Sequence, residues 1–265
     1  MSNRSRTSLC AGLVLLLALS SGLSGCASTA KADAEAAQNA RRATSHLNLG
    51  ADHLQAGRSA LALREFMTGA ALDPRNPRLQ YALGEAYLAR QKPEESEKHF
   101  LRALELHPEH HDARLSLSAL YIVQGRYQEA VEACDLLIDD PTFPSPWRAL
   151  ANRGWAQFKL GQPIEARSSL ELARDYSPAY WPAMLSLAVL ESAEGRRLEA
   201  IALLQEVIEL GPGDRVESEA NYRLAENYIA LGKRDRAVGY LTTAVAGAPE
   251  GEWARRSQEY LKLLR

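Results

Sequence analysis

The chain has 265 residues, with 31 lysines and arginines against 33 aspartates and glutamates, so its net charge is −2. No segment concentrates basic residues into the stripe that nucleic-acid binding requires, which argues against a DNA- or RNA-binding protein. Only three cysteines are present, too few for a framework of disulfides to hold the fold together.

The first 25 residues have the pattern of a secretory leader. Arg4 and Arg6 give a positive start, and an apolar run from Leu9 to Leu19 follows. A membrane span needs about 20 apolar residues, whereas the core of a signal peptide has about 7–15, so the run fits the second. Small residues follow and end in Leu-Ser-Gly-Cys at residues 23–26. We therefore predict a signal peptide over residues 1–25.

The Leu-Ser-Gly-Cys tetrapeptide resembles the lipobox of bacterial lipoproteins. That resemblance implies lipidation of Cys26, cleavage after Gly25 and acylation of the new amino group. Stable anchoring takes more than one acyl chain, which a lipidated N-terminal cysteine supplies. By the sorting rule of enteric bacteria, Ala27 in place of an aspartate favours the outer membrane, at its periplasmic face. The alternative is an ordinary signal peptide with a chance cysteine.

Cleavage would remove Cys10 with the leader, and lipidation would occupy Cys26, so Cys134 would remain as the single free cysteine and no intramolecular disulfide is expected. Removal of the leader would also take away Arg4 and Arg6 and bring the net charge to −4. Residues 26–42 are predicted to be a tether, because 27–42 contain no large apolar side chain that could bury a core. The alanine-rich part from about Ala34 has high helix propensity and can extend the first helix backward.

From residue 43 onward, the same features return with a spacing of about 34 residues, as at Leu49-Gly50 and Leu83-Gly84. A small residue recurs at Ala62, Ser96, Ala130, Ala166, Ala200 and Ala237. Four positions later a larger residue recurs at Phe66, Phe100, Cys134, Leu170, Leu204 and Leu241. Between the halves of most units stands a glycine, at Gly57, Gly125, Gly161, Gly195 and Gly232. Each unit is predicted to be a helical hairpin whose small residues let the two helices approach, and units must stack because one alone cannot bury its apolar face.

These units predict an all-α, right-handed solenoid of six repeats over residues 43–251. The predicted repeats are 43–76, 77–110, 111–144, 147–180, 181–214 and 218–251. Two joins depart from the spacing: a proline-rich segment at 139–146, and three extra residues at 215–217 that separate repeats five and six. After Gly251, one helical stripe of apolar residues predicts a capping helix over 252–265. The stripe consists of Trp253, Tyr260, Leu261 and Leu264.

The six in-phase copies resemble the tetratricopeptide repeat family over about 43–251. That resemblance implies that the first helix of each repeat lines a concave groove for a partner. The groove positions are Leu47, Ala51, Leu54, Tyr81, Glu85, Leu88, Leu115, Ala119, Ile122, Ala151, Trp155, Phe158, Leu185, Val189, Ser192, Tyr222, Glu226 and Ile229. An exposed apolar strip of this kind marks a binding site, and aromatic residues are typical anchors. The alternative is that neighbouring helices bury some of these side chains. The lysines and asparagines of a chaperone carboxylate clamp are absent from these positions.

Catalytic motifs are missing from the sequence. There is no His-Glu-x-x-His helix, no Cys-x-x-Cys pair, no phosphate-binding glycine loop and no Gly-x-Ser-x-Gly. Three histidines at His107, His110 and His111 could ligate a transition metal, but they fall in a turn between repeats, where polar residues are expected. Cys134 stands at a core position and is expected to act as a small hydrophobic residue. We therefore expect no enzyme activity, no metal, no cofactor and no small-molecule substrate.

The lipobox, the number of repeats and the proline-rich join together resemble the type IV pilus biogenesis lipoproteins of the PilF/PilW family. The join has Asp140-Pro141-x-Phe143-Pro144, followed by Ala149-x-x-Asn152-x-Gly154, and the likeness is greatest to the family's six-repeat social-motility member. That resemblance implies a pilotin, a factor that the secretin PilQ needs to form its outer-membrane ring, and hence a role in pilus-dependent motility. One alternative is a scaffold lipoprotein of another envelope complex, such as outer-membrane protein assembly. Another is an enzyme or metal protein built on the solenoid.

Overall fold

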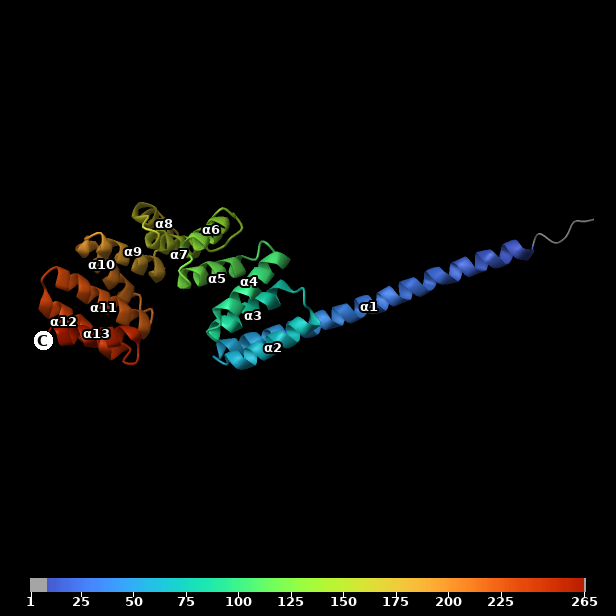
Figure 1. The fold of residues 1–265 in the computed structure, drawn as a ribbon, viewed down its shortest axis with the longest axis horizontal. Helices are drawn as coiled ribbons and strands as arrows, with labels where there is room; N and C mark the ends of the chain where they lie inside the picture. Colours follow the sequence, from blue (N-terminus) through green and yellow to red (C-terminus); the bar gives the residue numbers. More distant parts are fainter. Residues whose placement is uncertain (1–8, 265) are drawn as a thin grey trace, which may run out of the picture. The chain divides into compact units, whose positions relative to one another are not determined.

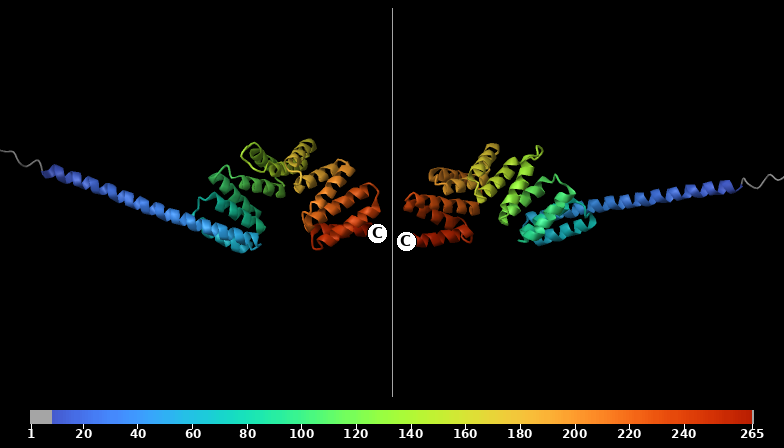
Figure 2. Two further views of the ribbon diagram at one scale, coloured as in Figure 1. Left: turned by 180° about the vertical axis from the view of Figure 1, so that it is seen from behind. Right: turned by 45° about the horizontal axis from the view of Figure 1, so that its top comes forward.

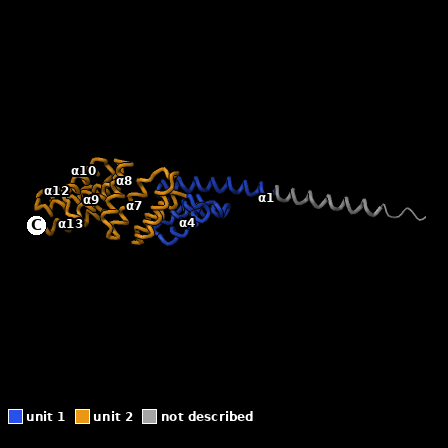
Figure 3. The backbone as a smooth tube through the Cα atoms, turned by 90° about the horizontal axis from the view of Figure 1, so that it is seen from above, with its two compact units in different colours: residues 1–109 blue, residues 110–265 orange. Residues whose placement is uncertain are grey.

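The structure is a computed structural model that describes the backbone of residues 9–264 and the side chains of residues 31–264. Within this part of the chain the regular structure consists of thirteen α-helices without a strand, as the repeats predict. The chain divides into two compact units, residues 1–109 and 110–265 (Figure 3). The side chains of the predicted signal peptide and of Cys26 lie outside the described part.

Unit 1 contains α1 (Leu9–Gln55), α2 (Ser59–Leu72), α3 (Pro77–Ala89) and α4 (Pro93–Leu106). Helix α1 runs without a break through the predicted tether, as its alanine content favours. The side chains of residues 31–42 are exposed except for the half-buried Asn39, and the first buried residue is Ala43. Helix α2 lies alongside only the last part of α1 (Figure 1). Among the residues with described side chains, the buried core of this unit therefore begins at Ala43.

Unit 2 carries the remaining repeats as a row of helix pairs (Figure 2). Its helices are α5 (His111–Val123), α6 (Tyr127–Ile138), α7 (Pro146–Lys159), α8 (Pro163–Tyr176), α9 (Trp181–Ala193), α10 (Arg197–Glu209), α11 (Asp214–Ala230), α12 (Arg234–Gly247) and α13 (Glu252–Leu263). The first helices of successive repeats contact one another, α5 with α7, α7 with α9, and α9 with α11. These neighbouring first helices line the candidate site described below.

The helices of a hairpin approach closely where the sequence places its small residues. On α7, a Cβ added to Gly154 would lie 2.6 Å from Cγ of Leu170 and 3.0 Å from the carbonyl oxygen of Ala166 on α8. Ala166 and Leu170 are themselves fully buried. The interpretation of the small residues as contact points between two helices is therefore confirmed at this hairpin.

The turns inside the hairpins use glycine for a backbone that other residues avoid. The five glycines between paired helices have φ between 71° and 82°, the left-handed region. In repeat two the same position is Gln91, with φ 58°. A residue with a Cβ is strained there by roughly 1–2 kcal/mol, so the second hairpin closes less favourably than the others.

The proline-rich join between repeats three and four is ordered by Asp140. One of its carboxylate oxygens accepts hydrogen bonds from the backbone N–H and the hydroxyl of Thr142, at 2.8 and 2.7 Å. The other lies 2.8 Å from Nε2 of His111. Phe143 is buried in a cluster with Leu137. The join is therefore a packed part of unit 2.

The three extra residues before repeat six do not separate the repeats as predicted. Helix α11 begins at Asp214, so residues 215–217 lie in its first turn and lengthen the helix to 17 residues. The carboxylates of Asp214 and Glu217 stand at the positive end of the helix dipole, which favours a helical start at this point.

The predicted capping helix is α13, which packs on α11 and α12. Its Ala254 and Ser257 are buried, and the ring of Trp253 lies 5.2 Å from that of Tyr222, centroid to centroid. None of the described helices has a stretch long and apolar enough to cross a bilayer.

Candidate partner-binding pocket

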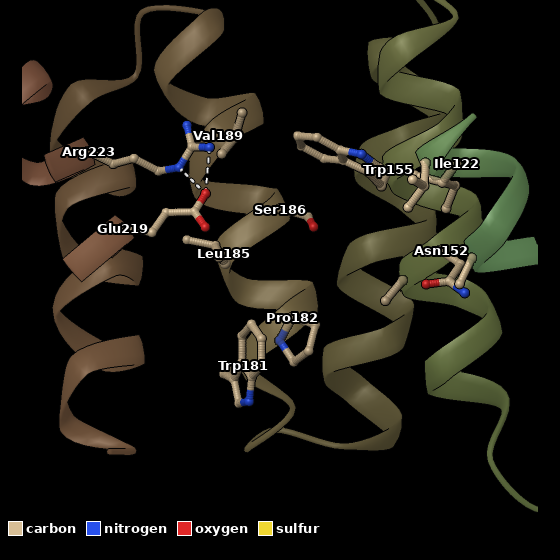
Figure 4. Close-up of a pocket in the computed structure, with 13 residues that line it drawn as sticks. Ile122, Asn152, Trp155, Trp181, Pro182, Leu185, Ser186, Val189, Glu219 and Arg223 are labelled. Atoms are coloured by element: carbon tan, nitrogen blue, oxygen red, sulfur yellow. Dashed lines mark hydrogen bonds and ion pairs between the residues drawn. The ribbon is translucent and has the colours of Figure 1, made fainter. Parts of the chain in front are cut away.

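An apolar pocket with a volume of about 360 Å³ opens on the first helices of unit 2 (Figure 4). Four helices line it, because the first helices of four consecutive repeats stand next to one another. Its residues are Ala119, Ile122 and Val123 of α5, Ala151, Asn152 and Trp155 of α7, Trp181, Pro182, Leu185, Ser186 and Val189 of α9, and Glu219 and Arg223 of α11.

Two tryptophans give the pocket its aromatic walls. Trp155 and Val189 stand toward one end, and Trp181 and Pro182 toward the other (Figure 4). The ring centroids of Trp155 and Phe158 lie 5.6 Å apart, and Nζ of Lys159 lies 4.8 Å from the centroid of the Trp155 ring. These contacts within α7 fix the indole at the pocket wall.

The charged residues of the pocket satisfy each other. One carboxylate oxygen of Glu219 accepts hydrogen bonds from Nε and Nη2 of Arg223, at 2.8 and 2.6 Å. The guanidinium of Arg223 also lies 5.0 Å from the ring centroid of Trp253 on the capping helix. Asn152 donates a hydrogen bond from Nδ2 to the hydroxyl of Ser118, at 3.0 Å. The pocket therefore presents apolar surface with little net charge.

Six of the predicted groove positions come together in this pocket: Ala119, Ile122, Ala151, Trp155, Leu185 and Val189. Phe158 contacts Trp155 and also packs against the core of unit 2. Among the others in this unit, Tyr222 contacts the rings of Trp253 and Tyr260, Glu226 is exposed, and Ile229 packs against the core. Burial, followed by the neighbouring carboxylate of Glu226, raises the pKa of Tyr222.

Two predicted groove positions belong to the core instead. Leu47 is 8% exposed and packs with Phe66, and Leu115 is 5% exposed and packs with Phe143. The neighbouring helix and the proline-rich join cover these side chains, so they are not part of an open surface. In unit 1, Leu54, Tyr81 and Glu85 are half-buried and Leu88 is exposed.

The sequence prediction missed several pocket residues, and Trp181 is the largest of them. Trp181, Leu185 and Val189 are spaced by four residues, so they share one face of α9. Extending the predicted face of this helix back by one turn would have found the second tryptophan. The other missed residues are Val123, Asn152, Pro182, Ser186, Glu219 and Arg223.

The residues considered for metal binding or catalysis have structural roles. His110 accepts a hydrogen bond from the backbone N–H of Ala113 at the start of α5, and His107 ends α4. Over the side chains that the structure describes, no three His, Cys, Asp or Glu residues are grouped so as to hold a metal ion. Cys134 is fully buried, and burial raises the pKa of its thiol to about 12. It therefore stays protonated and acts as a core residue.

Stacked helix pairs with an apolar pocket on their first helices define a helical repeat scaffold. Models of the tetratricopeptide repeat match residues 47–103, 81–146 and 151–215, and a second such model matches 191–255. The first model alone covers more than half of the chain. The chain belongs to the tetratricopeptide repeat family.

Curated relatives match only part of the repeats. Superkiller complex protein 3 of mouse is 34% identical over 92 residues, which are 35% of this chain and 6% of that protein. The human protein is 32% identical over the same length. Since the chain spans 6% of the length of these relatives, the match identifies the type of repeat and no more.

Solved structures match the chain over a much greater length. PilF of Pseudomonas aeruginosa has a TM-score of 0.69 at 17% identity, over 84% of this chain and 99% of that one. PilW, a widely conserved type IV pilus biogenesis factor, has a TM-score of 0.71 at 21% sequence identity, and the match covers 81% of this chain and 97% of PilW. A chain of the Cut9–Hcn1 assembly of the APC/C has a TM-score of 0.72 at 16% sequence identity, and the match covers 86% of this chain and 45% of that one. At such identities the likeness is one of fold.

Proposed function

We propose that the chain is a pilotin: a lipid-anchored scaffold of the outer membrane that holds subunits of the secretin PilQ while they assemble into the ring for type IV pili. The observation that carries the proposal is the extent of the likeness to PilF and PilW, whose chains are covered over 99% and 97% of their length. The Cut9–Hcn1 match has a slightly higher TM-score, 0.72, but covers only 45% of its chain. The lipobox at Cys26 and the proline-rich join, which also resemble the social-motility lipoprotein Tgl, add support from the sequence.

In this proposal the pocket of unit 2 receives an apolar segment of a secretin subunit. Trp155 and Trp181 supply the large aromatic surface that anchors protein contacts. Because Glu219 and Arg223 already pair with each other, an apolar segment can cover them without leaving a buried charge unpaired. Contacts between subunits in the growing ring would compete for the same apolar segment and so release it.

The acyl chains on Cys26 would keep this pocket close to the bilayer in which the ring forms. Tethering raises the effective concentration of the pocket for partners at the same surface. The exposed helical residues 31–42 would act as a spacer of about 18 Å, at 1.5 Å per residue.

The test is the double variant Trp155→Ala with Phe158→Ala in the bacterium. We expect loss of PilQ multimers and of pili, because truncation of each anchor residue costs about 2 kcal/mol or more and the two together weaken binding at least tens-fold. Tyr176→Ala is the matched control, since Tyr176 is an exposed aromatic residue of α8 outside the pocket. Phe158 packs against the core, so the single variant Trp155→Ala and a thermal melt of each protein separate binding from folding.

A folded, lipidated double variant that still assembles PilQ fully would refute the proposal for this pocket. The anchor is tested separately with Cys26→Ala, which should remove lipid labelling and release the protein from the membrane fraction. Unchanged labelling and fractionation of that variant would refute the lipid anchor.

A further inference from the structure

The pocket offers hydrogen-bond acceptors on three of its helices. On α11, one carboxylate oxygen of Glu219 accepts both hydrogen bonds from Arg223, so the other has no donor among the described residues. On α7, Asn152 gives its Nδ2 to Ser118, and its Oδ1 is left without a donor in the same part of the chain. On α9, no described residue forms a hydrogen bond with the hydroxyl of Ser186. A bound segment can therefore donate hydrogen bonds to these three oxygens.

The three acceptors form a row across the pocket. Figure 4 shows Asn152, Ser186 and Glu219 one after another from α7 over α9 to α11, at a level between Trp155 and Trp181. Helix α7 contacts α9, and α9 contacts α11. The axes of packed helices are about 8–10 Å apart, so a row over three of them is longer than one helical turn of about 5.4 Å.

The length of this row excludes compact groups of donors. The free N–H groups of a helical ligand are confined to its first turn, so they cannot reach acceptors on three helices. A lysine or arginine side chain gathers its donors in one group and brings a charge, while Glu219 is already paired with Arg223. An extended backbone instead presents N–H groups along one edge at every second residue, about 6.6 Å apart. Only the extended backbone distributes donors along the whole row.

A strand laid along the row would direct its side chains to the two aromatic walls. Successive side chains of a strand point to opposite sides, at right angles to the edge that forms hydrogen bonds. Trp155 and Val189 stand toward one end of the pocket, and Trp181 and Pro182 toward the other (Figure 4). Alternate apolar side chains of the strand would therefore contact alternate walls.

We propose that this pocket binds an extended apolar segment of its partner as a strand across α7, α9 and α11. Backbone N–H groups of the strand donate to Oδ1 of Asn152, the hydroxyl of Ser186 and the second carboxylate oxygen of Glu219. The unpaired edge of a sheet that has not yet closed presents such a row of N–H groups. The proposal rests on the function proposed above in taking this pocket as the partner site, and it adds how the segment is recognised.

The experiment is calorimetric titration of the full chain with two acetylated and amidated peptides. Both contain six residues that alternate valine and leucine between Gly-Ser ends, with every second peptide nitrogen methylated so that the peptides cannot form sheets. The control also replaces the remaining N–H groups of the six residues by ester oxygens, which keeps the shape, the side chains and the carbonyl groups. We expect the amide peptide to bind at least tenfold more tightly, because the ester peptide loses several hydrogen bonds. Equal affinities, or no measurable binding of either peptide, would overturn the proposal.

A matched pair of serine variants tests the row of acceptors itself. Ser186→Ala removes one acceptor, so it should weaken the amide peptide by roughly two- to tenfold, the effect of one lost hydrogen bond, and leave the ester peptide as it is. Ser168→Ala makes the same change at an exposed position of α8 outside the pocket and should alter neither affinity. Unchanged binding of the amide peptide to a folded Ser186→Ala protein, or equal weakening of both peptides, would overturn the assigned acceptor role.

These results are distinguishable from those that test the scaffold function. If PilQ assembly depends on Trp155 but the amide and ester peptides bind equally, recognition of the backbone is wrong and the pilotin role stands. If the amide peptide is preferred and Ser186→Ala weakens it, while PilQ assembles normally in the Trp155→Ala and Phe158→Ala double variant, recognition of a strand is supported and the pilotin role of this pocket is refuted.

Discussion

Gly154 is the position at which one added methyl group tests the packing of a hairpin most directly. It lies in the middle of α7, against α8. Gly239 is the matched control, because it also lies inside a helix of unit 2, α12, but no atom comes within 4 Å of the Cβ that alanine would add. Both substitutions make the same chemical change, so they differ only in what the methyl group meets.

The structure predicts that Gly154→Ala lowers the free energy of unfolding and that Gly239→Ala raises it. At Gly154 the new Cβ would lie 2.6 and 2.9 Å from two carbons of Leu170, whereas carbon atoms in contact are normally about 3.5–4.0 Å apart. Leu170 is fully buried, and the third contact, at 3.0 Å, is the backbone oxygen of Ala166, so neither can yield without a shift of α8. Overpacking costs about 1–3 kcal/mol, and alanine in a helix regains about 1 kcal/mol over glycine. With a backbone contact involved, we expect Gly154→Ala to lower the free energy of unfolding by about 1–2 kcal/mol.

The assay is urea unfolding followed by circular dichroism. Gly239→Ala should raise the free energy of unfolding by about 0.5–1 kcal/mol, since only the helix preference changes. Combining Gly154→Ala with Leu170→Ala should cost less than the sum of the two single changes, because the smaller side chain leaves space for the methyl group. If both glycine variants were stabilised equally, the distance between α7 and α8 would not depend on the missing side chain.

Two further predictions concern the join and the turns. A hydrogen bond with His111, followed by those from Thr142, lowers the pKa of Asp140 to about 2 from its usual 3.8. A carboxyl group with a lowered folded pKa stabilises the protein above its unfolded pKa and loses that contribution as the pH falls toward the folded value. Between about pH 4 and pH 2 the melting temperature of the unsubstituted protein should therefore fall more steeply than that of Asp140→Asn, and parallel curves would contradict this role. Gln91→Gly should raise the free energy of unfolding by up to about 1 kcal/mol, because relief of roughly 1–2 kcal/mol of strain in the left-handed turn exceeds the roughly 0.5–1 kcal/mol lost to glycine's greater freedom in the unfolded chain. A lower urea midpoint for this variant would show that the turn is not strained.

The predicted groove illustrates how far a repeat pattern reaches toward a site. The spacing of large and small residues identified the first helices correctly, and Ile122, Trp155, Leu185 and Val189 do share a pocket. The same pattern could not tell that Leu115 is covered, because Phe143 of the irregular join packs in the same cluster. Residues outside the repeat consensus thus decide which groove positions stay open.

Trp181 shows the complementary error. Trp181 is the first residue of α9, and the repeat pattern predicted groove positions only later in that helix. Its place in the pocket follows from the four-residue spacing to Leu185, which is visible in the sequence, and from the contacts of α9 with α7 and α11, which are not.

The sequence by itself determined the helical class, the hairpins, their turns and the phase of the repeats, because each depends on residues close together along the chain. The glycines of the turns and the small residues of the hairpins act within about 20 positions of each other, so a period of 34 residues reveals them. Only the tertiary structure decided which first-helix side chains are buried and which form the pocket. It also showed that Arg223 is shared between Glu219 in the pocket and Trp253 of the capping helix. Burial at these positions depends on side chains from other repeats and from the irregular join, whose placement follows from how the helices stack and not from local pattern.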